Sequence, residues 1–226
     1  KYFINKSFDF KVQGRFATRS IYSERANLDD TVDHYKEFPI NNFHDIPSNT
    51  GEIWDSFVFD NVLYLHTPKA LWRTYFNNNT FIAATDVSEV VLGTGKEFSR
   101  PSETVITTTN GYAGTISQWG GAITSFGYVF VDALQGKVFL LAGNLSELSD
   151  QGAITFFRNI GVSLKLGDSY NDNPFYGYGI TSAYDTDNRR LLITKTNAGG
   201  EVNTDNAFTI SYSLLSQSWI GIHTYH

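Results

Sequence analysis

The chain contains neither cysteine nor methionine among its 226 residues. Without cysteine it can form no disulfide, carry no thiolate nucleophile and build no cysteine-ligated zinc site. Methionine is missing even from the first position, which is Lys1. Removal of the initiator plus chance is one explanation. We favour another, that the chain is a fragment of a larger polypeptide, cut by a protease or trimmed to its ordered part.

Positive charge and long apolar runs are also scarce. Lys and Arg number 17 against 23 Asp and Glu, which gives a formal net charge of -6 with histidine neutral. An acidic protein is not drawn to phosphate backbones or to anionic membranes, and no Lys/Arg cluster marks a local basic patch. No apolar stretch is as long as a membrane span. We therefore predict no specific nucleic-acid binding and no membrane span.

The residues that are abundant favour β-structure. Hydrophobic residues make up 41% of the chain, enough to bury a core, and aromatic residues make up 15%. Aromatic and β-branched side chains suit a pleated, half-buried surface. Long runs of Ala, Leu, Glu and Lys, the usual helix formers, are missing. These features predict an all-β protein with a few short helices.

Two strand–turn–strand units share one layout, in which an aromatic-containing strand ends at an aspartate before a turn and an aliphatic strand. The first unit is Phe126–Ala142 and the second is Ile180–Lys195. Within the first, Phe130 and its aromatic neighbours alternate with Val129 and Val131, so both faces of this strand are apolar. Such a strand is expected inside stacked sheets.

The C-terminal part of the chain has the pattern of a four-stranded meander. Its predicted strands are Tyr178–Tyr184, Arg190–Thr196, Ala207–Leu215 and Ser218–Tyr225. Four short strands of this size correspond to one propeller blade. We predict β-propeller-like stacked antiparallel four-stranded sheets, part of a larger propeller, with blade-like units at residues 111–149 and 177–225.

The remaining segments give weaker signals within what we interpret as a single β-rich fragment over residues 1–226. Residues 28–50 are polar and are predicted to form a loop or arm, with at most a short helical turn near Asp29–Lys36. Asp60-Asn61 separates two apolar runs, as in a hairpin. Ala70–Phe76 is predicted to form one or two helical turns. Asp150–Asn159 is predicted to be a short helix with Asp150 as its N-cap.

Two motifs suggest ligand binding but have simpler interpretations. Gly93–Lys96 lacks the first glycine and the final Ser/Thr of a phosphate-binding loop, so we interpret it as a plain turn. Asp185, Asp187 and Asn188 could be half of a calcium loop, but the glycine and distal glutamate of that motif are missing. Aspartate and asparagine are ordinary turn residues, and we favour that interpretation.

The histidines and exposed-aromatic candidates do not form a recognisable site. The histidines include no pair with metal-ligand spacing on a recognisable helix; they are His34, His44, His66, His223 and His226. We interpret His223 as a packed or interfacial histidine. Trp119, Tyr176 and Tyr178 lie near glycines and could stack on a sugar, but core or interface positions are favoured. We predict no catalytic, cofactor-binding or metal-binding residue, and no cofactor.

Several segments taken in order resemble large structural tail proteins of short-tailed bacteriophages, especially the tail-tip or muzzle type of crAss-like phages. The resemblance extends over Thr85–His226 and not over the part before it. The stretches that carry it are Gly93–Val105, Asn110–Trp119, Tyr128–Leu141, Tyr184–Thr194 and Phe208–Gly221. Each stretch alone is weak, and their ordered series is fairly distinctive.

The resemblance implies a virion component of the distal tail, built around β-propeller-like sheets and assembled with other tail proteins and the remainder of its own polypeptide. Proteins of this type are thought to obstruct the tail channel until DNA is released. We expect a non-enzymatic role and a homo-oligomeric ring. A receptor- or glycan-binding module of the tail tip is the alternative, followed by a glycan-degrading propeller enzyme.

Overall fold

The computed structural model describes residues 16–24, 34–75, 80–82, 90–92, 101–106, 112–160, 179–195 and 207–223. The chain divides into two compact units, Lys1–Pro47 and Ser48–His226. In the first unit, strand β1 (Arg19–Ile21) pairs antiparallel with β2 (Phe43–Asp45), and η1 (His34–Lys36) is a 3₁₀ turn. The segment 28–50, predicted as a loop or arm, therefore contains a short strand as well as the expected helical turn.

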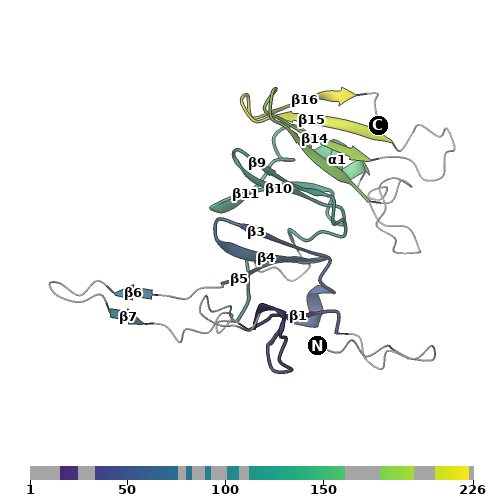
Figure 1. Ribbon diagram of the computed structural model, residues 1–226. Coiled ribbons are helices and arrows are strands. Elements are labelled where there is room, and N and C mark those ends of the chain that lie inside the picture. Colours follow the sequence, from purple (N-terminus) through teal and green to yellow (C-terminus); the bar gives the residue numbers. More distant parts are fainter. Residues whose placement is uncertain are drawn as a thin grey trace. The chain divides into compact units, whose positions relative to one another are not determined.

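The second unit contains three four-stranded antiparallel sheets, and each follows the order of its strands in the sequence (Figure 1). The first sheet consists of β3 (Asp55–Phe59), β4 (Val62–Thr67), β5 (Ala70–Thr74) and β8 (Glu103–Thr104). The middle sheet consists of β9 (Gly121–Thr124), β10 (Gly127–Asp132), β11 (Lys137–Ala142) and β12 (Asn144–Glu147). The third sheet consists of β13 (Thr181–Asp185), β14 (Arg190–Lys195), β15 (Phe208–Ser213) and β16 (Ser218–His223).

Shorter elements complete the second unit. A separate hairpin of β6 (Thr80–Ile82) and β7 (Val90–Leu92) is inserted between β5 and β8. The 3₁₀ turn η2 (Ser48–Thr50) precedes β3, and helix α1 (Ile154–Ile160) follows β12. The described part of the chain is thus all-β apart from short helical elements, as predicted. The described sheets do not form a closed ring, so the larger propeller stays a prediction.

Strand β10 explains why the sheets stack, because all six of its residues are buried. On one face, Tyr128 and Phe130 belong to a core that also contains Tyr64 and Leu71 of the first sheet. On the other face, its valines belong to a core shared with the third sheet. Each fully buried side chain of this size stabilises the fold by about 1.5–3 kcal/mol. The middle sheet therefore lies between the other two, which confirms the prediction of a strand covered on both faces.

The second core is largely aliphatic. It joins the middle sheet to the third sheet and to α1, and its members include Val129, Val131, Val138, Phe157, Leu191, Ile193 and Ile210. Phe157 of α1 is fully buried, and its ring centroid lies 5.0 Å from that of Trp219. The helix thus closes one end of this core against β16.

Two local predictions were wrong. Ala70–Thr74 is strand β5 and not a helical turn, because pairing with β4 and burial of Leu71 and Trp72 outweigh helix propensity. Helix α1 begins at Ile154, so Asp150 is not its N-cap. Asp150 instead lies in a turn, where its backbone carbonyl accepts a hydrogen bond from the Gly152 N–H.

Candidate functional site: a clamp segment across three sheets

Residues Tyr112–Gly120, here called the clamp segment, connect all three sheets. The contact with the first sheet is made by backbone hydrogen bonds to the β4–β5 turn. The N–H of Tyr112 donates to the Lys69 carbonyl and the N–H of Thr115 to the Thr67 carbonyl, both at 2.9 Å. A Cβ at Gly114 would lie 2.2 Å from the Pro68 carbonyl oxygen. Only glycine therefore allows this close approach.

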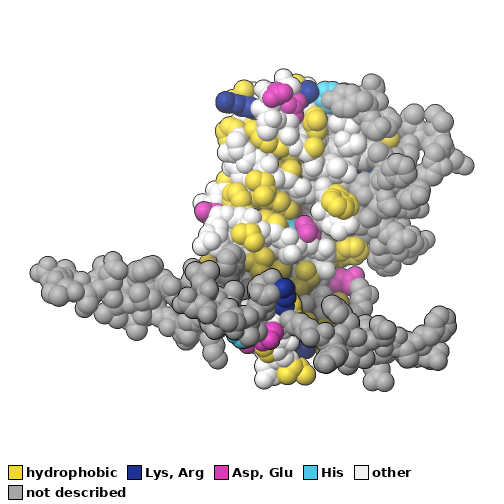
Figure 2. Space-filling model, in the orientation of Figure 1, with side chains coloured by type: hydrophobic (Ala, Val, Ile, Leu, Met, Phe, Trp, Pro, Cys, Tyr) yellow, Lys and Arg dark blue, Asp and Glu magenta, His cyan; other side chains and the backbone are white. Residues whose placement is uncertain are grey.

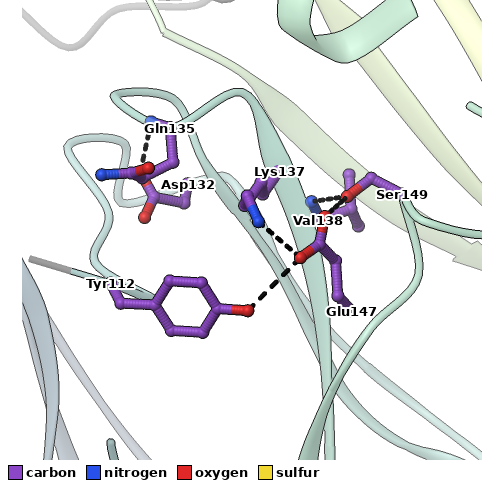
Figure 3. Close-up of polar contacts among 7 residues, drawn as sticks. All are labelled: Tyr112, Asp132, Gln135, Lys137, Val138, Glu147 and Ser149. Atoms are coloured by element: carbon purple, nitrogen blue, oxygen red, sulfur yellow. Dashed lines mark hydrogen bonds and ion pairs between the residues drawn. The ribbon is translucent and has the colours of Figure 1, made fainter. Parts of the chain in front are cut away.

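The contact with the middle sheet is centred on Asp132 at the end of β10. The N–H of Gly114 donates to Asp132 Oδ2 at 3.2 Å, and the N–H of Leu134 donates to Oδ1 at 3.0 Å. The N–H of Gln135 also donates to Oδ1 at 3.0 Å (Figure 3). The Thr115 hydroxyl adds a bond to the Val131 carbonyl. Burial raises the pKa of Asp132 to about 6, although these N–H groups favour the charged form. The carboxylate is thus a buried acceptor for the clamp segment.

The contact with the third sheet follows a few residues later. The Ser117 hydroxyl donates to the Ile180 carbonyl at 2.9 Å and accepts from the Ile180 N–H at 3.0 Å. The Ser182 N–H donates to the Trp119 carbonyl, and the Ser182 hydroxyl donates to the Gly120 carbonyl, both at 2.9 Å. These bonds fix the start of β13 beside the segment that enters β9.

A second polar cluster holds Tyr112, the first residue of the clamp segment, to β12, the last strand of the middle sheet. The Tyr112 hydroxyl and Lys137 Nζ both donate to Glu147 Oε2, at 3.3 and 2.6 Å (Figure 3). The Ser149 hydroxyl donates to Glu147 Oε1 at 2.8 Å. Burial alone would raise the pKa of Glu147, but the bonds from Lys137, Ser149 and Tyr112 hold it below its usual value.

Three hairpin turns of the middle and third sheets share one chemistry. In each, the last strand residue accepts hydrogen bonds from backbone N–H groups of the turn; these residues are Asp132, Asp185 and Ser213. The last turn residue has positive φ in all three, at 63° for Gly136, 48° for Arg189 and 50° for Gln217. The repeated layout seen in the sequence is therefore a repeated turn geometry.

The possible calcium loop is one of these turns. Asp185 Oδ1 accepts from the N–H groups of Asp187 and Asn188, and Oδ2 accepts from Asn188 Nδ2 and Arg190 Nε at 2.9 and 2.8 Å. Asn188 and Arg190 lower the pKa of Asp185 to about 2. Both carboxylate oxygens thus have partners within the hairpin, as the turn interpretation requires. Among the described residues, no group of three or more His, Asp or Glu could hold a metal ion.

The histidines lie in unrelated places. His66 on β4 is fully buried, and its Nε2 lies 3.2 Å from the Tyr128 hydroxyl. His223 on β16 is half-buried, with Nε2 2.8 Å from the hydroxyl of the buried Ser211. In the first unit, His34 contacts Glu37, and His44 is on β2. His226 lies outside the described residues.

Of the three aromatic candidates, the structure describes only Trp119. Trp119 has 55% of its surface exposed, so it is not a core residue. Its interface and sugar-stacking interpretations both stay predictions. Tyr176 and Tyr178 lie outside the described residues, as do Gly93–Lys96.

Sequence reasoning missed the clamp segment and the environment of His66. The clamp connects positions far apart in the chain, and its hydroxyl and backbone groups have no recognisable spacing. Gly114, one of the two glycines of the clamp segment, was the available signal. As for membranes, no helix in the described ranges is long and apolar enough to span one.

Comparison with known proteins bears on what this arrangement is for. A family model described as Crassvirus muzzle protein matches residues 1–205. No curated protein matches the chain. The match includes residues 1–84, which lay outside the resemblance recognised in the sequence, and it ends before β15 and β16. It therefore supports the muzzle-type resemblance and extends it toward the N-terminus.

Proposed function

The chain belongs to the crassvirus muzzle protein family, and we propose that it helps to close or shape the tail channel at the distal end of the virion. Membership supports a phage virion protein with a structural, tail-associated role that assembles with other virion proteins. The channel role, a homo-oligomeric ring and the lack of enzymatic activity are parts of the proposal.

The observation that carries the proposal is the clamp segment. A protein that resists force at a channel needs sheets that do not slide or separate. Here one short segment bonds to the β4–β5 turn, to Asp132 and to Ile180, and two cores fill the spaces between the sheets. Its buried polar groups have protein partners, so they would rigidify the stack rather than bind a ligand.

The edges of the stack suit a surface along which DNA moves. The first strand of each sheet, β3, β9 or β13, contains no Lys or Arg, and neither does the last strand, β8, β12 or β16. We call the three first strands the first-strand edge. Val58 and Ile123 are exposed there by 53% and 59%. In Figure 2, hydrophobic and uncharged atoms also prevail over the sheets of this unit. A surface without cations does not retain a phosphate backbone.

The first strands lie close together in the stack. Ser182 of β13 bonds to Trp119 and Gly120, just before β9. The ring of Phe57 on β3 stacks on the ring of Tyr128 on β10, with 3.7 Å between the ring centroids. Tyr128 is in turn the cross-strand partner of Ile123 on β9. We propose that the first-strand edge faces the channel.

Cross-linking in the particle tests this assignment. Since the chain has no cysteine, Ile123→Cys or Leu215→Cys introduces a single thiol for a DNA-reactive maleimide probe. Both positions are exposed, but Leu215 lies in the turn between β15 and β16, away from the first strands. A probe at Ile123 should cross-link to DNA during ejection, and a probe at Leu215 should not. The cross-linked position is identified from the labelled peptide. Equal labelling, or labelling at Leu215 alone, would reject the assignment.

A glycan-binding tail-tip module is the second candidate, because Trp119 is exposed next to Gly120. Exposed indole rings stack on sugars and amphipathic surfaces. Trp119→Ala should then abolish binding on a glycan array, whereas Phe126→Ala, the loss of another exposed aromatic ring, should not. Wild-type protein that binds no glycan would remove this candidate.

A further inference from the structure

His66 lies at the contact between the first and middle sheets. It is fully buried on β4. Its ring centroid is 5.2 Å from that of Phe57 on β3, and 5.8 and 4.8 Å from those of Tyr128 and Phe130 on β10. The imidazole is therefore enclosed by aromatic rings from both sheets.

Only one ring nitrogen of His66 has a hydrogen-bond partner among the described residues. Nε2 lies 3.2 Å from the Tyr128 hydroxyl, while Nδ1 is buried and has none. The neutral ring fits if Nε2–H donates to Tyr128, because Nδ1 is then a bare lone pair. The Tyr128 hydroxyl reaches this place over Gly121, where a Cβ would lie 1.9 Å from it.

We propose that His66 is an acid-sensitive latch, and that protonation at Nδ1 releases the first sheet from the middle sheet. A proton at Nδ1 would create a buried N–H with no acceptor and a positive charge among aromatic rings. Both are costly without compensation. The closed contact excludes the charged ring, so acid shifts the population toward an open form in which the imidazolium reaches water.

Burial, and not a neighbouring charge, sets the direction of the His66 pKa shift. On β3, Asp55 is paired across from His66, and on β10 the nearest titratable group is Tyr128. The next cross-strand pair on the same face of β4 and β5 is Tyr64 and Arg73. Burial lowers the pKa of His66 to about 3. It also holds the pKa of Tyr128 above its usual value, so that hydroxyl stays protonated.

Hydrogen exchange followed by mass spectrometry on the full chain tests the latch. With an open-form pKa of 6.5, protonation of His66 should favour opening about thirtyfold at pH 5 over pH 8. Exchange in β4 and β10, corrected for intrinsic rates, is compared between wild type and His66→Phe. The ratio of the exchange rates in the two proteins isolates the contribution of His66, since Asp132 titrates in both. His34→Phe, which removes a half-buried histidine of the first unit, should keep the wild-type response.

Two results would overturn the proposal. One is a pH response of β4 and β10 that is the same in wild type and His66→Phe. If that variant does not fold, NMR titration of His66 in the wild-type chain decides instead. The latch predicts that the closed protein keeps a neutral His66 ring, and that an imidazolium signal appears only together with loss of protection in β4 and β10. A reversible midpoint near pH 6 with β4 and β10 still protected would mean that the aromatic rings stabilise the imidazolium in place.

Discussion

Asp132 and Asp185 occupy the same position of the same turn, but their carboxyl groups are shifted in opposite directions. Each accepts hydrogen bonds from two backbone N–H groups of its own turn. Asp132 is buried, which raises its pKa to about 6. Asp185 also accepts from Asn188 and Arg190 near solvent, which lowers its pKa to about 2. The difference between the two pKa values therefore comes from the stacking of neighbouring sheets over Asp132 and not from the geometry of the turn.

Stability should therefore depend on pH through Asp132. The folded pKa of about 6 lies above the unfolded value of 3.8, so the contribution is fully present below pH 3.8 and is lost as pH rises through 6. The shift corresponds to about 3 kcal/mol. Urea unfolding of wild type and Asp132→Asn between pH 4 and pH 7 should show wild type losing most of that difference, about 2.4 kcal/mol, relative to the variant. A difference that stays constant with pH would contradict the buried-carboxylate interpretation.

Asp185→Asn is the matched comparison and should behave in the opposite way. The folded pKa of Asp185 lies below 3.8, so its contribution is present above pH 3.8 and is lost as pH falls toward 2. Wild type should gain stability relative to this variant as pH rises from 2 to 5. The direction of the change, measured by the same unfolding experiment, is the test.

Ser117→Ala tests the connection between the clamp segment and the third sheet. The substitution leaves the buried N–H and carbonyl of Ile180 without their Ser117 partner. An unsatisfied buried polar group costs about 1–3 kcal/mol, and we expect a loss near 2 kcal/mol. Exchange should accelerate most in β13. Ser216→Ala, in the exposed turn before β16, should change the free energy of unfolding by less than about 0.5 kcal/mol. Equal effects would show that the Ser117 bonds do not fasten the sheets.

Much of the sheet structure was predictable because it is encoded locally. Alternation of aromatic and valine residues in β10 predicted burial on both faces, and the short Asp60-Asn61 turn predicted the β3–β4 hairpin. Both turn residues have positive φ, at 49° and 58°, as the two-residue turns that suit hairpins require. Asparagine and aspartate tolerate this region better than most residues, so glycine was not needed.

The contacts between sheets were not predictable, because they depend on residues far apart in the chain. Ser117 and Ile180 are separated by 63 positions, and His66 and Tyr128 by 62. Nothing in the spacing of a lone serine or histidine indicates such a partner. The same long-range packing makes Ala70–Thr74 a strand although its residues resemble a helical turn.

Gly114→Ala should be the most damaging small substitution in the clamp segment. Its Cβ would lie 2.2 Å from the Pro68 carbonyl oxygen and 2.6 Å from that of Thr67, and both are backbone atoms. The segment must shift, which weakens the bonds that Gly114 and Thr115 make to Asp132 and Thr67. We expect a loss of about 3 kcal/mol or more, measured by urea unfolding.

Gly221→Ala is the control for this substitution. Position 221 on β16 has no heavy atom within 4 Å of an added Cβ. The alanine should leave stability unchanged or raise it by about 0.5 kcal/mol, because it restricts the unfolded chain. Comparable losses in both variants would mean that the close approach of Gly114 to the β4–β5 turn is not what makes its substitution costly. A loss confined to Gly114→Ala, with faster exchange in both β5 and β10, would show that this approach joins the first sheet to the middle sheet.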